Sequence, residues 1–269
     1  MTDAATSRPH SATRGASRPA PPRFEVIGVE GLPEVRPGDD LAHLIVEAAA
    51  GQGTPVQSTD ILLIGQKIVS KAEGRILKLA DVTPSAIATA MAAGVGRDPR
   101  LLEVILRESR RVVRMDKTVV ITETHHGWIC ANAGVDQSNV DQDCVVLLPE
   151  DADRSARSLR DGLRRLAGVE VGVIVTDTFG RPWREGLTNV AIGVSGVASL
   201  RSYLGEMDPA GRPLTATILA VADELASAAE LVMGKLDRIP VAIVRGLRLP
   251  PGDDGSKPLI RDPARDLFR

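Results

Sequence analysis

The sequence predicts a fold of mixed helices and β-strands in which buried strands support a functional site. Short apolar runs rich in β-branched residues recur along the chain, and segments of helical periodicity lie between them. The clearest run is Val171–Val175, which is followed by Thr176, Asp177 and Thr178 and then by a glycine and a proline. We therefore expect a buried strand that opens into a loop bearing a carboxylate between two hydroxyl groups.

Composition limits the class of protein. The 269 residues are 43% hydrophobic, enough for one large domain or two small ones, but only 2% are aromatic, so the core must consist of Val, Ile, Leu and Ala. Scarce aromatic residues argue against single-stranded nucleic-acid binding, which uses stacking on rings. The net charge of −2 predicts no general attraction to nucleic acid or to anionic membranes.

The cysteines and the apolar runs indicate the cellular compartment. Cys130 and Cys144 have no metal-ligand partner nearby in sequence and are typical of small buried residues in a reducing compartment. No stretch approaches the ~18 apolar residues that span a bilayer, and no apolar signal-peptide segment is visible at the start. We expect a soluble cytoplasmic protein.

The chain divides into a tail and a folded part. Residues 1–23 are rich in Ser, Thr, Ala, Arg and Pro and predict a disordered N-terminal tail, so the folded domain covers residues 24–269. It opens with a strand at Phe24 and a turn-rich loop, after which Asp39 or Asp40 is expected to cap a helix over Leu41–Ala50.

A basic segment follows the next predicted strand, Asp60–Gly65. Lys67 and Lys71 are four residues apart, so in a helix they would share a face with Ser70 nearby. This pair is a candidate phosphate site, although the glycine spacing of a P-loop is absent. An ordinary surface helix is the alternative interpretation.

The middle of the chain predicts helices and then a hairpin. We expect Ala80–Arg114 to be mostly helical, with a break at Gly94–Pro99 and arginines at the helix end. Thr118–Thr122 and Gly127–Cys130 are predicted to pair as strands across a turn that contains His125 and His126. Adjacent histidines point to different sides of a strand, which favours turn residues over metal ligands.

A second polar loop, residues 131–140, contains Asp136 and amide side chains. It is followed by a buried strand over Cys144–Leu148 and by an amphipathic helix over Asp153–Gly168, with Leu159, Leu163 and Leu166 predicted to face inward. Beyond the central strand, we expect close packing of the small residues in Val190–Leu200, a turn region over Tyr203–Pro213, a strand over Leu214–Val221, a helix over Ala222–Met233 and a last strand over Val241–Val244.

Together the polar segments predict metal-dependent phosphoryl transfer without a Walker A loop. Asp136 and Asp177 offer the hard oxygens that Mg²⁺ or Mn²⁺ accepts. Lys67 and Lys71 can neutralise phosphate, and Arg181 and Arg184 carry forked donors suited to phosphate or carboxylate.

Six segments in order identify a resemblance. LPEVRPGDDL, QKIVSKAEGR, NAGVDQSNV, TDTFGRPWREG, VADELASAAELVMGK and PVAIVRG closely resemble the coenzyme F420-0:L-glutamate ligase (F420 gamma-glutamyl ligase) family over about residues 24–269. In actinobacterial relatives a nitroreductase-like domain begins just after a DLF motif. The present sequence stops at Asp266–Arg269, which corresponds to a stand-alone ligase or to a chain cut at that fusion point.

The resemblance implies a fold and an activity. The family fold is α+β, with mixed β-sheets and flanking helices in two interleaved parts, assembled as an intertwined homodimer. Members use GTP to join coenzyme F420-0, which ends in a phospholactate, to L-glutamate through an acyl phosphate, and can then add further γ-linked glutamates. Mg²⁺ or Mn²⁺, as two ions, is the implied cofactor, and K⁺ is associated with family members.

Residue roles also come from the resemblance. Asp136 and Asp177 match ligands of one divalent ion, and Thr178 matches a ligand of a second. We take Lys67, Arg181 and Arg184 as candidate catalytic residues, with an arginine directed at the acyl phosphate. The positions that match GTP contacts are Leu32, Pro33, Glu34, Val35, Gln66, Lys71 and Asn139.

One position departs from the family pattern. In archaeal relatives the region matching Met233–Lys235 supplies a further oxygen ligand, which a protonated Lys235 cannot do. Two alternatives stay open: another metal-dependent phosphoryl-transfer enzyme, and a non-catalytic paralogue that binds the nucleotide or F420.

Overall fold

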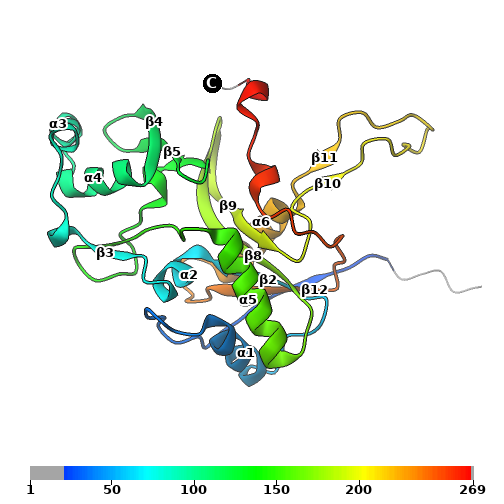
Figure 1. Ribbon diagram of the computed structural model, residues 1–269. Coiled ribbons are helices and arrows are strands. Elements are labelled where there is room, and N and C mark those ends of the chain that lie inside the picture. The colour runs from blue at the N-terminus through cyan, green and yellow to red at the C-terminus, as the bar shows by residue number, and fades with distance from the viewer. Residues whose placement is uncertain (1–20, 268–269) are drawn as a thin grey trace, which may run out of the picture.

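A five-stranded mixed sheet lies at the centre of the computed structural model, which describes residues 21–267 (Figure 1). Within this range, the pair β2/β8 is parallel and the other neighbours in the sheet are antiparallel, which confirms the predicted combination of helices and mixed sheet. Residues 1–20, most of the predicted tail, lie outside the described residues, as do Phe268 and Arg269. The spatial order is β1 (Glu25–Gly28), β12 (Val241–Arg245), β2 (Ile61–Gly65), β8 (Gly172–Arg181) and β9 (Arg184–Ser195).

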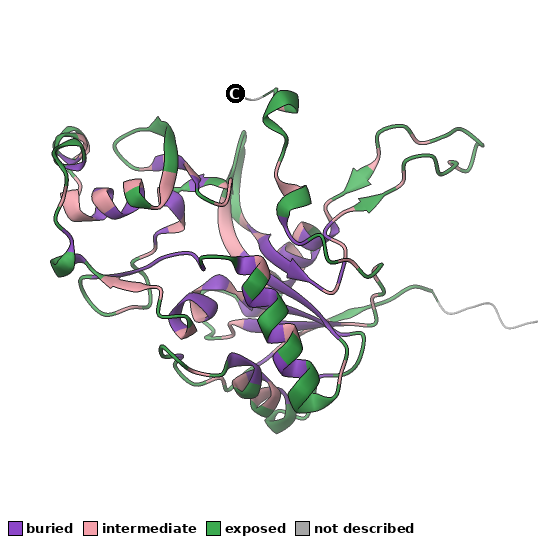
Figure 2. Cartoon of the chain, viewed as in Figure 1, coloured by how far each residue is buried: buried purple, intermediate pink, exposed green. Residues whose placement is uncertain are grey.

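Both faces of the sheet are buried along β12, β2 and the first half of β8, which explains why these segments are continuous apolar runs (Figure 2). Side chains alternate between the faces along a strand, so Leu62 and Ile64 join one apolar cluster while Ile61 and Leu63 join another. The covering helices are α1 (Leu41–Gly51) and α5 (Ala152–Ala167) for the first cluster and α6 (Val221–Met233) for the second.

Helices α1 and α5 have the predicted cap and buried face, except at the C-terminal end of α5. The side chain of Asp40 accepts a hydrogen bond from the backbone N–H of His43 and caps α1, as predicted. In α5, Leu159 and Leu163 are buried, but the prediction that Leu166 faces inward is wrong, since it is 47% exposed. Residues 164–167 are all exposed, so the last turn of α5 extends beyond the packed face.

A third apolar cluster is built from the segment between residues 76 and 148. This segment lies beside the central sheet in Figure 1 and contains the loop with Asp136. The elements of this segment are β3 (Ile76–Lys78), the 3₁₀ helix Leu79–Asp81, α3 (Ala86–Val95), α4 (Pro99–Arg107), β4 (Ser109–Met115), β5 (Val120–Thr124), β6 (Ile129–Ala131), the 3₁₀ helix Asn132–Gly134 and β7 (Cys144–Val146).

The prediction of helix as far as Arg114 is wrong beyond Arg107. The chain there forms β4, which pairs antiparallel with β5, while β5 pairs with β6 as predicted across the histidine turn. Arg107 lies in the last turn of α4, as predicted, whereas Arg111 donates to Glu123 across the β4/β5 pair at 2.8 Å and serves a cross-strand contact. The side chains of β4 from Arg110 to Met115 are exposed, which left little apolar alternation to identify the strand.

After β9 the chain makes a long excursion before α6. The strand predicted over Leu214–Val221 is reduced to β11 (Ile218–Leu219), which pairs with β10 (Arg201–Ser202) to form the projecting arm in Figure 1. Two further 3₁₀ helices, Lys257–Leu259 and Pro263–Arg265, complete the described chain. None of the helices within residues 21–267 combines the length and the apolar character that a membrane span requires.

Candidate functional site

Helix α2 (Gln66–Ala72) positions the predicted basic pair. It begins directly after Gly65, the last residue of the buried strand β2, so its first turn is fixed to the sheet. Lys67 and Lys71 lie on one face of this helix, as their spacing predicted, and both line the same cleft. Lys71 is buried and forms an ion pair with Glu34 from the loop before α1.

The loop after β6 brings Asp136 to Lys67. The Nζ atom of Lys67 lies 2.7 Å from Oδ2 of Asp136 and donates to the hydroxyl of Ser138 at 2.6 Å. The backbone N–H of Ser138 also donates to Asp136 at 2.7 Å. Burial alone would raise the pKa of Asp136, but the hydrogen bonds from Lys67 and Ser138 outweigh it and lower the pKa.

Asp177 and Thr178 lie on a strand, which corrects the prediction of a loop after Val175. β8 continues to Arg181 and forms a hairpin with β9, with a register shift between Val175 and Thr176. Burial raises the pKa of Asp177 to about 7; the backbone N–H of Thr178 opposes this rise, and the charge of Asp136 adds to it. The two carboxylates therefore interact electrostatically.

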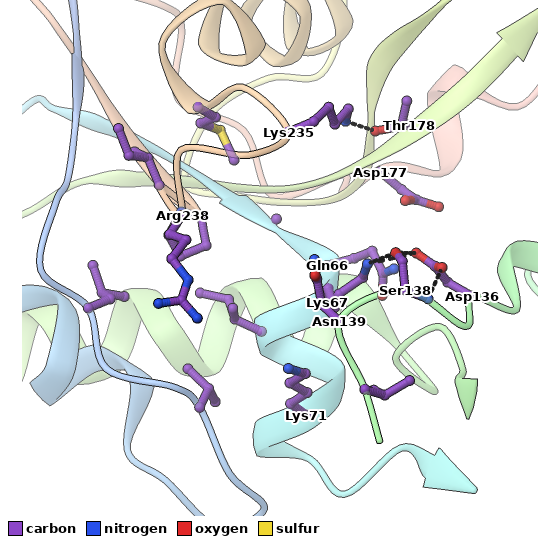
Figure 3. A pocket seen from close by; sticks show the side chains of 18 of the residues that line it. Gln66, Lys67, Lys71, Asp136, Ser138, Asn139, Asp177, Thr178, Lys235 and Arg238 are labelled. Atoms are coloured by element: carbon purple, nitrogen blue, oxygen red, sulfur yellow. Dashed lines mark hydrogen bonds and ion pairs between the residues drawn. The ribbon is translucent and has the colours of Figure 1, made fainter. Parts of the chain in front are cut away.

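These elements enclose a cleft of about 1380 Å³ (Figure 3). Asp136 and Asp177 both line it, so the two carboxylates predicted to share an ion belong to one cavity and not to separate surfaces. The predicted site residues that line the cleft are Leu32, Pro33, Glu34, Val35, Gln66, Lys67, Lys71, Asp136, Asn139, Asp177 and Thr178.

Arg181 and Arg184 are not brought to this cleft. Both are exposed near the tip of the β8/β9 hairpin, and neither is among the residues that line the cavity. The guanidinium group of Arg181 donates to the backbone carbonyls of Glu185 and Gly186, within its own hairpin. Their predicted catalytic role is thus without geometric support in the isolated chain.

The structure adds residues that sequence reasoning did not assign to the site. Asn189, Glu230 and Arg238 also line the cleft, from β9, α6 and the segment before β12. The sequence carried one usable signal, a glycine followed by charged residues directly before a buried strand, over Gly234–Arg238. Gly234 has φ +58°, and the turn it permits directs this segment to the cleft.

The donor set of the cleft suits one hard divalent cation. Two carboxylates that repel each other, one with a raised pKa, gain most from a cation between them, and oxygen is the ligand type that Mg²⁺ and Mn²⁺ prefer. Among residues 21–267, no group of three or more His, Cys, Asp or Glu side chains could hold a metal ion. His125 and His126 instead bond the backbone carbonyls of Arg107 and Glu150.

The chain is similar to a defined set of proteins. The family model described as F420-0:Gamma-glutamyl ligase matches residues 31–246. A protein from Methanopyrus kandleri named coenzyme F420:L-glutamate ligase is 51% identical over 252 residues, which is 92% of this chain and 97% of that protein. Proteins of the same name from Methanothermobacter thermautotrophicus and Methanocaldococcus jannaschii are 46% and 42% identical, over 91% and 92% of this chain and 99% and 97% of their own lengths. On this match, which runs through every segment of the cleft, the chain belongs to the F420-0:gamma-glutamyl ligase family.

Proposed function

We propose that this protein is a ligase that uses GTP to join the carboxylate of coenzyme F420-0 to the amine of L-glutamate. The relatives named coenzyme F420:L-glutamate ligase align over almost the whole chain and over almost their own whole lengths. The observation that carries the proposal is that two carboxylates, Asp136 and Asp177, line the same cleft as Lys67 and Lys71.

The reaction needs a phosphoryl group because a carboxylate has no leaving group for an incoming amine. In our proposal, a carboxylate oxygen of F420-0 attacks the γ-phosphorus of GTP, the bond to the bridging oxygen breaks, and GDP leaves. The glutamate nitrogen, after loss of a proton, then attacks the acyl carbon and inorganic phosphate leaves with the bonding electrons. Further γ-linked glutamates would be added by the same two steps.

The residues of the cleft have separate tasks in this scheme. Lys67 and Lys71 would bind the phosphate oxygens of GTP and so place the γ-phosphorus, because phosphoryl transfer depends mainly on positioning and charge neutralisation. Lys71 is held by Glu34, whose loop also lines the cleft and would contact the nucleotide. Exchange of Glu34 for a phosphate oxygen would couple that loop to GTP binding.

A divalent ion fits the acidic side of the cleft. Asp136 and Asp177 would hold Mg²⁺ or Mn²⁺, which when bound supplies charge neutralisation for the triphosphate. Asp136 is paired with Lys67 at 2.7 Å, so release of Lys67 to a phosphate frees the carboxylate for the cation. GTP and the divalent ion should therefore bind with positive coupling.

We also propose a homodimer. Leu236, which lines the cleft, is 91% exposed, Leu231 on α6 is 87% exposed, and Leu204 and Met207 are exposed on the projecting arm. Light scattering coupled to gel filtration tests this assignment, and a monomeric mass at micromolar concentration would contradict it. The same measurement with and without K⁺ shows whether that ion affects dimer formation.

The test of the activity is a product assay with purified protein, GTP, Mn²⁺, L-glutamate and F420-0. Mass spectrometry should detect F420-0 extended by glutamate, and phosphate should appear only when both F420-0 and glutamate are present. Asp177→Asn should lower the rate by on the order of 10²-fold or more, whereas Asp161→Asn on the outer face of α5 should not change it. Phosphate release without F420-0 and glutamate would instead favour a phosphohydrolase, and nucleotide binding without turnover would favour a binding paralogue.

A further inference from the structure

Thr178 belongs to a closed ring of four side chains joined by polar contacts. The Nζ atom of Lys235 donates to the Thr178 hydroxyl at 2.7 Å, and this hydroxyl in turn donates to Oδ1 of Asn189 at 2.7 Å. The amide of Asn189 donates to Glu230 at 2.7 Å, and Glu230 pairs with Lys235 at 2.9 Å. The four side chains come from β8, β9, α6 and the turn after α6, so the fold builds this ring from four separate elements.

This ring leaves Thr178 poorly suited to a divalent ion. A hydroxyl has one proton and two lone pairs; the proton points to Asn189, and Lys235 uses one lone pair. An ammonium group has no lone pair to offer a cation. Its charge lies 2.7 Å from the oxygen that a second ion would need, and like charges at such separations repel strongly.

The ammonium group of Lys235 is nevertheless available to a ligand. The side chain lines the cleft and is 57% exposed, and Figure 3 shows it reaching the wall that carries Thr178 and Asp177. Its charge lowers the pKa of Asp177, although burial dominates that group, so the ammonium lies within electrostatic reach of Asp177. Glu230 and Thr178 fix its position without covering it.

We propose that the ammonium group of Lys235 takes the place of a second divalent ion, so that this chain binds one divalent ion per nucleotide and neutralises the remaining phosphate charge with its own side chain. The inference rests on the proposed nucleotide-dependent function and deepens it. It assigns Lys235 as a phosphate-binding residue.

The test counts Mn²⁺ ions by electron paramagnetic resonance in the presence of guanosine 5′-(β,γ-imido)triphosphate. The wild-type protein should bind one Mn²⁺ per chain. Lys235→Gln removes the charge and adds an amide oxygen, so it should bind two, while the exposed control Lys117→Gln should still bind one. Two ions in the wild type, or one in Lys235→Gln, would overturn the inference and leave the proposed function standing.

A second variant measures the phosphate contact. Lys235→Met removes the charge without adding an oxygen ligand, and the affinity for the same nucleotide analogue should fall by about tenfold or more, as for loss of a charge-assisted hydrogen bond. An unchanged affinity in calorimetry would show that Lys235 does not contact the nucleotide. Wild-type protein that binds neither Mn²⁺ nor the analogue would refute the proposed function itself, and the inference with it.

Discussion

Replacing Asp177 by asparagine should stabilise the metal-free protein at alkaline pH. Burial raises the pKa of this carboxyl group from its ordinary 3.8 to about 7, despite the opposing hydrogen bond from the Thr178 backbone. The folded state therefore holds the proton more tightly than the unfolded chain does. The stability that this group contributes is greatest below about pH 4 and is lost as the pH rises towards 7.

The magnitude follows from the size of the pKa change. At 1.36 kcal/mol per pH unit, a rise from 3.8 to about 7 corresponds to about 4 kcal/mol. We reduce this to on the order of 2 kcal/mol because the side chain keeps partial contact with water, which screens the buried charge. Asparagine is neutral at every pH, so Asp177→Asn should exceed the wild type by that amount at pH 8 and match it near pH 4.

Urea unfolding at pH 4, 6, 7 and 8 in the presence of a chelator measures this difference. Asp116→Asn is a control of opposite sign, because hydrogen bonds from Thr118 lower the pKa of Asp116, and its removal should cost stability at pH 8. If Asp177→Asn is no more stable than the wild type at pH 8, the ionised carboxylate is not costly in the empty cleft. The electrostatic argument for a cation between the two aspartates would then fail.

Three further predictions concern the scaffold around the cleft. Gly193→Ala should destabilise the protein by about 1–3 kcal/mol or more in urea unfolding, because a Cβ there would lie 2.3 Å from the carbonyl oxygen of Ala152 in α5; a neutral result would mean that the helix can shift. Arg245→Met should cost about 3 kcal/mol, since it leaves the buried Asp60 carboxylate without its two guanidinium hydrogen bonds, and an unchanged unfolding midpoint would contradict this. Burial raises the pKa of the Cys130 thiol to about 12, so iodoacetamide should modify it at pH 8 far more slowly in the folded than in the urea-unfolded protein, and equal rates would be inconsistent with a buried thiol.

Local signals were enough to predict the parts of the site that lie on single elements. The four-residue spacing of Lys67 and Lys71 placed both side chains on one face as soon as α2 formed. Asp177 follows the buried part of β8, Asp136 lies in the polar loop after β6, and both line the same cleft. These four residues are charged and lie close to apolar residues in the sequence, which was sufficient to identify them as candidate site residues.

The contacts that depend on pairing between distant segments could not be predicted. Continuation of β8 past Asp177 requires β9 as a partner, and the hairpin turn places Trp183 at a positive φ that no local sequence rule favours. β4 escaped detection because its arginines and exposed valines show no apolar alternation. The contact between Lys235 and Thr178 joins residues 57 positions apart through a glycine turn, so only the folded chain reveals it.

The lysines of the cleft are all paired before any ligand arrives: Lys67 with Asp136, Lys71 with Glu34 and Lys235 with Glu230. An incoming polyanion therefore meets lysines whose charge is already partly neutralised at all three positions, and not bare positive charge. Ionic strength weakens the old pairs as well as the new ones, so the affinity for a nucleotide should depend on salt less steeply than three unpaired lysines would require. Of these acidic groups, Asp136 belongs to the proposed ion site, so the fold links the arrival of negative charge at Lys67 to the uptake of a cation by Asp136.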